Sequence, residues 1–346
     1  MVKLGMKLCD FEKLKTIADF ANQKTLTHDN WSELYPFYKN VYNKHVSALF
    51  ESYPLYNTLT KSNKYRYIIV EVGDDRVLVV YKVIHILKTH QIRTVNEPIS
   101  IKNNKKNEFT IIGKLKKLPF VKMLFNETCK KLVRSEKTEI YNDYFYDFSK
   151  RDYMDKSKFR SKRGLNKLEA DDKFSVNVYH SLPYNKISHL REQWIIGMEK
   201  FLGHKVAPTS TKNLINIVET GHDDLIILTL EYDGMIVNVQ VMLKTDFGYA
   251  YSLYINHMGR TAKQFRDNHN LYILLSNMQD IQNYYTRKIL SEYGIDYLYI
   301  AGARPTEKRL LAHKETVTDG VLKYFTDNCN FDSKYSEPKK KVNRLF

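Results

Sequence analysis

The stretch from Leu225 to Leu243, LIILTLEYDGMIVNVQVML, decides the fold class of this chain. It consists of two apolar runs, Leu225–Tyr232 and Met235–Leu243, joined by the dipeptide Asp233-Gly234. β-Branched residues are frequent in both runs, and Asp-Gly is a favoured pair for the positive φ angles of a tight hairpin turn. The stretch therefore predicts a long antiparallel hairpin.

Strand and helix patterns alternate on both sides of this hairpin. Further strands are predicted at Phe174–Tyr179, Tyr249–Ile255, Tyr297–Ala301 and Leu322–Phe325. Helices are predicted at Leu190–Phe201, at Asn213–Thr220 and from Thr306 onward. The segment Leu271–Tyr293 is predicted to form one long helix or two shorter helices, with Gly294 as the C-cap.

The N-terminal half repeats the order of helices followed by a hairpin. Helices are predicted within residues 10–60, with residues 27–30 as an N-cap before Trp31, and a second hairpin joins Tyr65–Val72 to Arg76–Val83. Beyond it we expect a short strand at Phe109–Ile112, a helix at Pro119–Val133 and a short aromatic strand or turn at Tyr144–Phe148. This order favours an α+β chain of two similar lobes, at 1–150 and 151–330, with a basic tail at 331–346, over a doubly wound parallel fold.

The composition is that of a folded protein. The chain has 346 residues, of which 43% are hydrophobic and 13% aromatic, and this excludes a disordered polyelectrolyte. No run approaches the roughly 18 apolar residues of a membrane-spanning helix, and the first residues lack the apolar segment of a signal peptide, so we expect a cytoplasmic protein. Cys9, Cys129 and Cys329 are far apart and lack metal-ligand spacing, which predicts neither a disulfide framework nor a metal site.

The charge is positive and unevenly distributed. The formal net charge is +16, and residues 102–131, 150–167 and 334–344 carry +7, +6 and +4, so these three segments hold all of the excess and the rest of the chain is close to neutral. Lys, Asn, Tyr and Ile have AT-rich codons, so genome composition alone also raises the Lys count. The clustering favours a polyanionic partner such as tRNA, DNA or an anionic lipid surface.

The second of these segments contains a basic stripe. If it is helical, Lys156, Arg160, Arg163 and Lys167 follow one another at helical spacing along one face. Such a stripe can track phosphate groups, which makes these four residues candidates for binding nucleic acid or phosphate. The alternative is an ordinary solvated helix face.

Several short motifs resemble a known family. Residues 143–147, DYFYD, and residues 158–167, KFRSKRGLNK, are similar to segments of tandem-GNAT proteins related to the phosphatidylglycerol lysyltransferase catalytic domain and, more distantly, to Fem-type peptidoglycan aminoacyltransferases. The segments 231–237, 293–302 and 310–314 are similar to the family's hairpin, closing strand and Lys-bearing helix. The order of elements agrees over about residues 60–326, which implies two GNAT-like lobes, the second of them catalytic.

The resemblance also implies a site. In the GNAT fold two adjacent central strands splay apart, and the acyl donor enters the V between them. Lys314, on the final predicted helix, is then placed to stabilise the oxyanion of a tetrahedral intermediate, and Arg304 to hold a donor phosphate. Tyr251, Tyr254 and His257 leave the central strand and form the pool of groups for proton transfer.

The donor is left open between two classes. The glycine-rich loop that binds the pyrophosphate of coenzyme A is missing, because residues 257–270 contain only Gly259. Arg260, Lys263 and Arg266 in this segment are candidates to bind donor phosphates with their side chains instead. Fem-like relatives also lack the loop and take an aminoacyl group from tRNA, so acyl-CoA and aminoacyl-tRNA both remain possible donor substrates, with no tightly bound cofactor.

Two functions of different classes follow from these observations. The first is an acyltransferase that moves an acetyl or aminoacyl group onto an amine or hydroxyl acceptor by direct attack, with a nucleic-acid base, an anionic lipid or a small amine as the acceptor. The second is a non-catalytic nucleic-acid-binding protein on a degenerate GNAT fold, which the missing glycine loop favours. The signatures GxxxxGK[ST], HExxH, GxSxG and CxxC are absent from the sequence.

Overall fold

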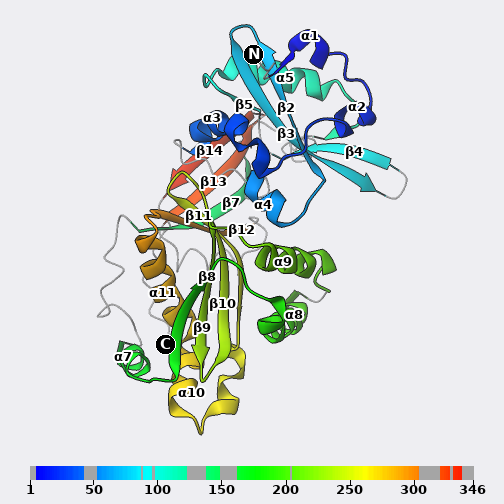
Figure 1. Ribbon diagram of the computed structural model, residues 1–346. Helices are drawn as coiled ribbons and strands as arrows, with labels where there is room; N and C mark the ends of the chain where they lie inside the picture. The colour runs from blue at the N-terminus through cyan, green and yellow to red at the C-terminus, as the bar shows by residue number, and fades with distance from the viewer. Residues whose placement is uncertain are drawn as a thin grey trace. The chain divides into compact units, whose positions relative to one another are not determined.

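A computed structural model describes residues 5–42, 53–86, 89–95, 98–122, 138–148, 162–202, 205–303, 320–327 and 330–336. The chain divides into two compact units, unit 1 with residues 1–143 and 302–346 and unit 2 with residues 144–301. Helices flank a mixed sheet in each unit, as the elements labelled in Figure 1 show, so the predicted α+β class is confirmed. The lobe limits expected from the sequence, 1–150 and 151–330 with a tail at 331–346, stay predictions.

The sheet of unit 1 is built on the first hairpin. Its strands are β1 (Met6–Lys7), β2 (Tyr65–Val72), β3 (Asp75–Ile86), β4 (Thr89–Thr94) and β6 (Val121–Lys122), in that order, and β5 (Ile99–Ser100) pairs with β3. Strands β2 and β3 are antiparallel, as predicted, whereas β1 pairs with β2 and β4 with β6 in parallel. Alternate side chains of β2 and β3, such as Val70, Val79 and Tyr81, enter the core of this unit.

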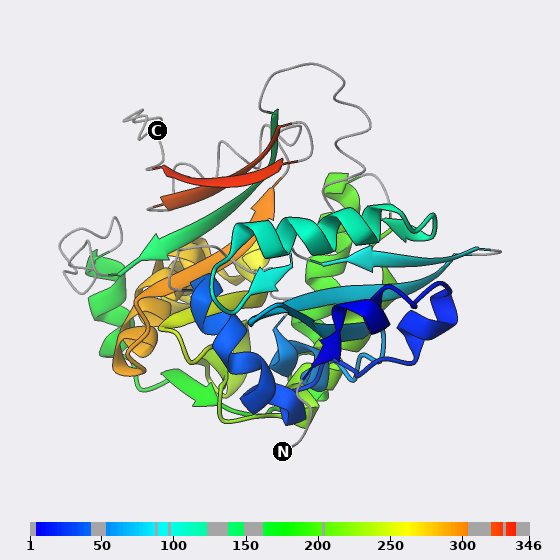
Figure 2. The same cartoon turned by 90° about the horizontal axis from the view of Figure 1, so that it is seen from above.

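The helices of unit 1 are short except for two. They are α1 (Leu8–Phe11), α2 (Ile17–Ala21), η1 (His28–Asn30), α3 (Trp31–Tyr42), α4 (Pro54–Leu59) and α5 (Lys105–Lys116). Helix α3 begins at Trp31, as predicted, after a 3-10 turn. Figure 2 shows α5 along one face of the sheet.

Two predictions in unit 1 are wrong. Phe109–Ile112 lies inside α5 and is not a strand, because the Asn104 side chain caps the helix by accepting hydrogen bonds from the backbone N–H groups of Lys106 and Asn107. The expected helix at Pro119–Val133 does not begin at Pro119, since Val121–Lys122 forms β6 beside β4. Residues 123–133 lie outside the described residues.

The sheet of unit 2 contains the hairpin that decides the fold. Its strand order is β7 (Thr138–Asp147), β12 (Tyr297–Ala303), β11 (Tyr249–His257), β10 (Met235–Lys244), β9 (Leu225–Tyr232) and β8 (Phe174–Tyr179). The β9–β10 turn has φ angles of 53° at Asp233 and 76° at Gly234, as the Asp-Gly pair predicts. The pairs β8–β9, β9–β10 and β10–β11 are antiparallel, whereas β11 and β12 are parallel.

Helices lie on both faces of this sheet. They are α7 (Lys162–Glu169), η4 (Tyr184–Lys186), α8 (Ser188–Leu202), α9 (Pro208–Thr220), η5 (Gly259–Phe265), α10 (His269–Ser276) and α11 (Met278–Glu292). In Figure 1, α8 and α9 lie on one side of the strands and α11 on the other. Asn277 separates α10 from α11. Of the two alternatives for Leu271–Tyr293, one long helix or two shorter helices, the structure has the second.

The C-terminal segment contains two further strands. Strand β13 (Gly320–Asp327) includes the predicted strand Leu322–Phe325 and pairs with β14 (Asn330–Ser336), which the sequence did not predict. The predicted helix from Thr306 lies outside the described residues. Within the part of the chain that is described, each helix is too short or too polar to cross a bilayer.

Gly221 ends α9 and provides a test of how tightly unit 2 is packed. Its φ is +68°, and a Cβ there would lie 2.6 Å from the Ser181 Cβ. We predict that Gly221→Ala lowers the free energy of unfolding by about 3 kcal/mol, measured by urea denaturation, because backbone strain and steric overlap add. Gly234→Ala is the matched control, since its φ is also positive but its Cβ would meet nothing within 4 Å; we expect a loss of about 1 kcal/mol. Equal losses would contradict this packing.

Candidate functional site

Strand β11 contains a β-bulge at the point where it leaves its parallel neighbour. Ser252 pairs with Met242 and Tyr254 with Val241, so Leu253 is an extra residue without a partner on β10. Pairing with β12 runs from Tyr249–Tyr297 to Ser252–Ile300, whereas β11 continues to His257 and β12 to Ala303. Because a bulge bends its strand and increases the local twist, we infer that the two strands part after Ser252.

The bulge also determines which side chains share a face. Tyr251 lies opposite Leu243 and Tyr254 opposite Val241, and these two β10 residues are on the same face. His257 lies opposite Asn238 and therefore belongs to the other face. The structure thus brings Tyr251 and Tyr254 together and separates His257 from them.

An aromatic layer leads along β12 and β11 to the bulge. The Tyr249 and Tyr297 rings are stacked with centroids 5.1 Å apart, and the Tyr251 and Tyr299 rings are 5.8 Å apart. Phe145 of β7 extends the layer, with its ring 5.4 Å from that of Tyr299. Burial raises the pKa of Tyr249 to about 12, so its phenol stays uncharged at neutral pH.

Arg191 of α8 lies over β11 beyond the bulge. Its side chain is buried, and its guanidinium carbon is 4.3 Å from the Trp194 ring centre and 5.5 Å from that of Tyr254. Nε donates to Thr211 Oγ1 at 3.2 Å and Nη2 to Ser210 Oγ at 2.7 Å. Arg191 was not identified as a site residue from the sequence. The one sequence signal for it is its spacing of three residues from Trp194 on a predicted helix, which places the two side chains on the same helix face.

Tyr254 is held between Arg191 and α9. Its hydroxyl donates a hydrogen bond of 3.2 Å to the backbone carbonyl of Ser210. Burial raises the pKa of Tyr254, and the nearby Arg191 charge opposes this shift without cancelling it. Tyr254 is therefore a neutral phenol at neutral pH and can donate a proton but not accept one.

The opposite face of the sheet carries a buried amide network. Gln282 Oε1 accepts from Asn238 Nδ2 at 3.1 Å, and Gln282 Nε2 donates to Gln240 Oε1 at 2.9 Å. The Thr286 hydroxyl donates to the same Gln240 oxygen, and Gln240 Nε2 donates to Ser252 Oγ at 3.1 Å. The network connects α11 through β10 to the residue that precedes the bulge, so it fixes where the strands part.

The segment after β11 is a 3-10 turn without a glycine-rich loop. The Gly259 backbone N–H donates to His257 Nδ1 at 3.1 Å, and the turn then leads into the Asn268 cap of α10. Lys263 and Arg266 are exposed, and neither forms an ion pair with a described residue. Arg260 also lies in η5.

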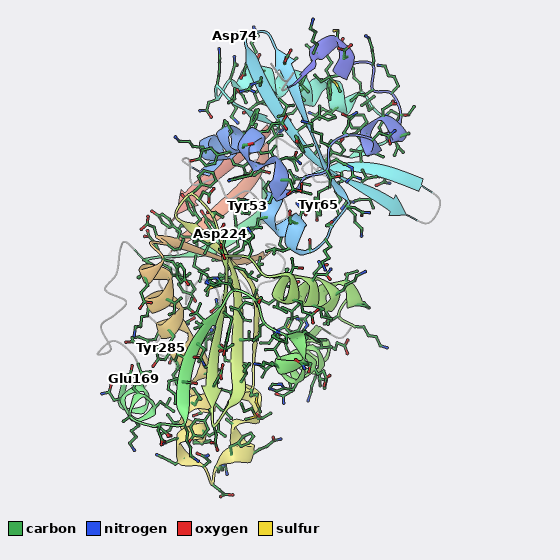
Figure 3. All side chains as sticks on the ribbon, in the orientation of Figure 1. Tyr53, Tyr65, Asp74, Glu169, Asp224 and Tyr285 are labelled. Carbon is green, nitrogen blue, oxygen red and sulfur yellow. The ribbon has the colours of Figure 1, made fainter. Side chains whose placement is uncertain are left out.

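Helix α7 is anchored beside this turn. Asp171, just after the helix, accepts hydrogen bonds from Asn270 Nδ2 at 2.7 Å and from the Tyr232 hydroxyl at 3.0 Å. Glu169 of α7 accepts one from the Tyr285 hydroxyl at 3.3 Å, and Figure 3 labels both residues. These bonds place α7 at the same end of the sheet as α10.

The predicted site residues are therefore only partly brought together. Exposed Lys167 and the backbone of Arg163 belong to α7, at the end of the sheet where η5 carries Lys263 and Arg266. Four predicted residues lie outside the described part of the chain: Lys156, Arg160, Arg304 and Lys314. Among the described residues no group of three or more His, Cys, Asp or Glu could hold a metal ion.

Among known proteins, the chain is similar to several solved structures. No family model and no curated protein matches the chain. It is similar to FemX, with 12% identity, a TM-score of 0.47 and coverage of 82% of this chain and 88% of that one. It is also similar to the C-terminal domain of a putative lysylphosphatidylglycerol synthetase from Agrobacterium fabrum, with 10% identity, a TM-score of 0.42 and coverage of 82% of each chain.

The amide network gives a prediction about stability. Gln240→Met removes both hydrogen-bonding groups from the centre of the network and leaves the Gln282 amide and the Thr286 hydroxyl without their acceptor. We predict a loss of about 3 kcal/mol in the free energy of unfolding, because each buried unsatisfied group costs about 1–3 kcal/mol. In the control Gln264→Met, an exposed glutamine is replaced, and urea unfolding should change by less than about 0.5 kcal/mol. Similar losses in both variants would show that the network does not stabilise the sheet.

Proposed function

We propose that this chain is a GNAT-like acyltransferase that transfers an acyl group, preferably an aminoacyl group, to an amine or hydroxyl acceptor. The observation that carries this proposal is the end of β11–β12 pairing at Ser252, directly before the bulge at Leu253. Beyond that point, within the described part of the chain, β12 no longer pairs with the adjacent edge of β11, so backbone N–H groups on that edge could bond to a ligand. An acyl carbonyl between the two strands would accept their hydrogen bonds.

These N–H groups support a mechanism of direct attack. The acceptor attacks the carbonyl carbon of the donor, and negative charge develops on the carbonyl oxygen as the tetrahedral intermediate forms. The intermediate then collapses with cleavage of the bond between the carbonyl carbon and the leaving group, which gains a proton while the acceptor loses one. Preorganised backbone donors stabilise that charge without reorganisation. We assign Lys314 the same task, because the sequence of residues 310–314 resembles the Lys-bearing helix of the family.

Proton transfer in this mechanism needs a donor for the leaving group. Tyr254 fits this role because its raised pKa keeps the phenol proton at neutral pH and because it follows the bulge directly. Tyr251 lies on the same face one step before the bulge, with its ring against Tyr299. His257 is on the opposite face, which makes it a weaker candidate.

We propose aminoacyl-tRNA as the donor rather than acyl-CoA. Glycines are needed for backbone amides to close around a pyrophosphate, and the turn at η5 has only Gly259. Exposed Lys263, Arg266 and Lys167, with Arg260, Arg163 and the preceding basic residues, suit the longer phosphate chain of a tRNA. The same glycine-poor turn favours the second candidate, a nucleic-acid-binding protein without catalysis.

The donor assignment predicts a specific salt dependence. We expect the double variant Lys263→Ala/Arg266→Ala to bind aminoacyl-tRNA at least 10-fold more weakly at low salt. Each phosphate contact with a single strand contributes about 0.7 to the magnitude of the slope of log K against log salt concentration. Loss of the two contacts should therefore reduce this magnitude by about 1.4. Filter binding over a range of NaCl concentrations measures both quantities.

The matched control removes two exposed lysines of unit 1 that lie outside the three basic segments. Lys15→Ala/Lys64→Ala changes the net charge by the same amount. It should leave both the affinity and the slope within experimental error. An equal effect of the two double variants would mean that tRNA binding follows net charge and has no site at η5.

The role of Tyr254 is tested by kinetics. We predict that Tyr254→Phe slows transfer of a labelled aminoacyl group from tRNA to hydroxylamine by about 100-fold, because leaving-group protonation is lost. The affinity for aminoacyl-tRNA should not change. Tyr293→Phe, at an exposed tyrosine after α11, is the control and should keep the wild-type rate. If the wild-type chain transfers nothing above the background from either aminoacyl-tRNA or acyl-CoA, the non-catalytic alternative holds.

A further inference from the structure

Arg191 is a buried cation without a carboxylate partner. Its side chain is 1% exposed, and among the described residues no Asp or Glu forms an ion pair with it. Taking a charge out of water is costly unless an opposite charge or several hydrogen bonds compensate for it. Burial accordingly lowers the pKa of the Arg191 guanidinium.

The groups around Arg191 compensate for the charge only in part. The two hydroxyls that accept from Nε and Nη2, on Ser210 and Thr211, are neutral. The Trp194 and Tyr254 rings add attraction through their faces, at 4.3 and 5.5 Å. Among the described residues Nη1 has no hydrogen-bond acceptor. Nη1 is also not one of the fully buried atoms without a partner, so solvent or a ligand can reach it.

A second buried group on the same face of β11 also lacks partners. Asn256 is 1% exposed, and neither its Nδ2 nor its Oδ1 has a hydrogen-bond partner among the described residues. It lies opposite Val239, two residues from Val241, so it shares the face of Tyr254 over which Arg191 lies. Buried amides without hydrogen bonds are rare, and each such group calls for a specific explanation.

We propose that Arg191 and Asn256 form a binding site for an oxyanion of the acceptor, a phosphate or a carboxylate. The oxyanion would accept hydrogen bonds from Arg191 Nη1 and Asn256 Nδ2. Ser210 and Thr211 lie in the first turn of the 13-residue helix α9, whose dipole also favours an anion. The inference rests on the proposed function and deepens it: the acceptor carries a negative oxygen group close to the amine or hydroxyl that attacks beside Tyr254.

The surroundings of the site admit a small anion. Tyr184, Trp194, Ser210 and Thr211 are all partly exposed, in contrast to Arg191 itself. Rotation of such side chains is sufficient to open the guanidinium to a ligand, without separation of α8 from the sheet. Closure over the ligand would then exclude water from the charged pair and strengthen it.

Tryptophan fluorescence tests the site directly. The chain has two tryptophans, Trp31 and Trp194, and the Trp194 ring lies against the Arg191 guanidinium. We expect inorganic phosphate, acetate or both to change the fluorescence with saturation at constant ionic strength, relative to chloride. The change should be absent in Trp194→Phe. The anion that binds more tightly identifies the oxyanion of the acceptor.

Two variants with the same change of charge separate a site from general electrostatics. Arg191→Met should weaken anion binding at least 10-fold and leave stability unchanged or higher, because a buried charge is replaced by an apolar chain. Lys244→Met, which removes a cation from the far end of β10, should bind the anion as the wild type does. If Arg191→Met does not fold, Arg191→Lys and Asn256→Leu should each weaken binding at least fivefold.

The proposal is overturned if neither anion binds, or if Arg191→Met binds as tightly as the wild type. These outcomes do not depend on acyl transfer. Loss of transfer with intact Arg191-dependent binding would remove the proposed function and leave the site. Transfer without anion binding would leave the function and remove the site.

Discussion

The parting of β11 from β12 is the constraint on which the site depends. A parallel pair normally uses its hydrogen bonds along its whole length, but here the pairs end at Ser252 and Ile300 while both strands continue. The extra residue Leu253 accounts for this geometrically, because it bends β11 within its continuing ladder to β10. The result is a stretch of β11 that is paired with β10 on one edge and, within the described residues, no longer paired with β12 on the other.

Polar residues are buried on both faces of the sheet near Ser252, where β11 and β12 part. The residues on the two faces have different roles. The amides of Gln240 and Gln282 satisfy one another and thereby hold Ser252 in place. On the other face, both polar atoms of the Asn256 side chain lack a partner among the described residues, and Arg191 has only two neutral hydroxyls as hydrogen-bond acceptors. A satisfied network stabilises a structure, whereas unsatisfied groups of this kind are a cost that a ligand can remove. The supporting face is satisfied at Gln240 and Gln282 although Asn238 Oδ1 lacks a described partner there, and we assign the face of Arg191 and Asn256 to the acceptor.

The sequence predicted those parts of the fold that local chemistry decides. The Asp233-Gly234 turn and the two apolar runs around it form the expected hairpin, because the turn chemistry and the strand pattern agree. Phe109–Ile112 was misread as a strand, because its β-branched residues outweighed the cap at Asn104 in a short window. The bulge at Leu253 could not be predicted, since it is a mismatch between two strands and not a property of either one. Arg191 was missed for a related reason: its burial against Tyr254 depends on how α8 packs on β11.

Hydrogen exchange along β11 tests the central claim most directly. In the free protein, the amides of residues 253–257 that do not bond to β10 should exchange fast. A non-hydrolysable aminoacyl-tRNA should slow them strongly, while the amides of Tyr249–Ser252, already paired, keep their rates. If the 253–257 amides are protected to the same degree with and without the donor, the two strands do not part to bind it, and this account of the site is contradicted.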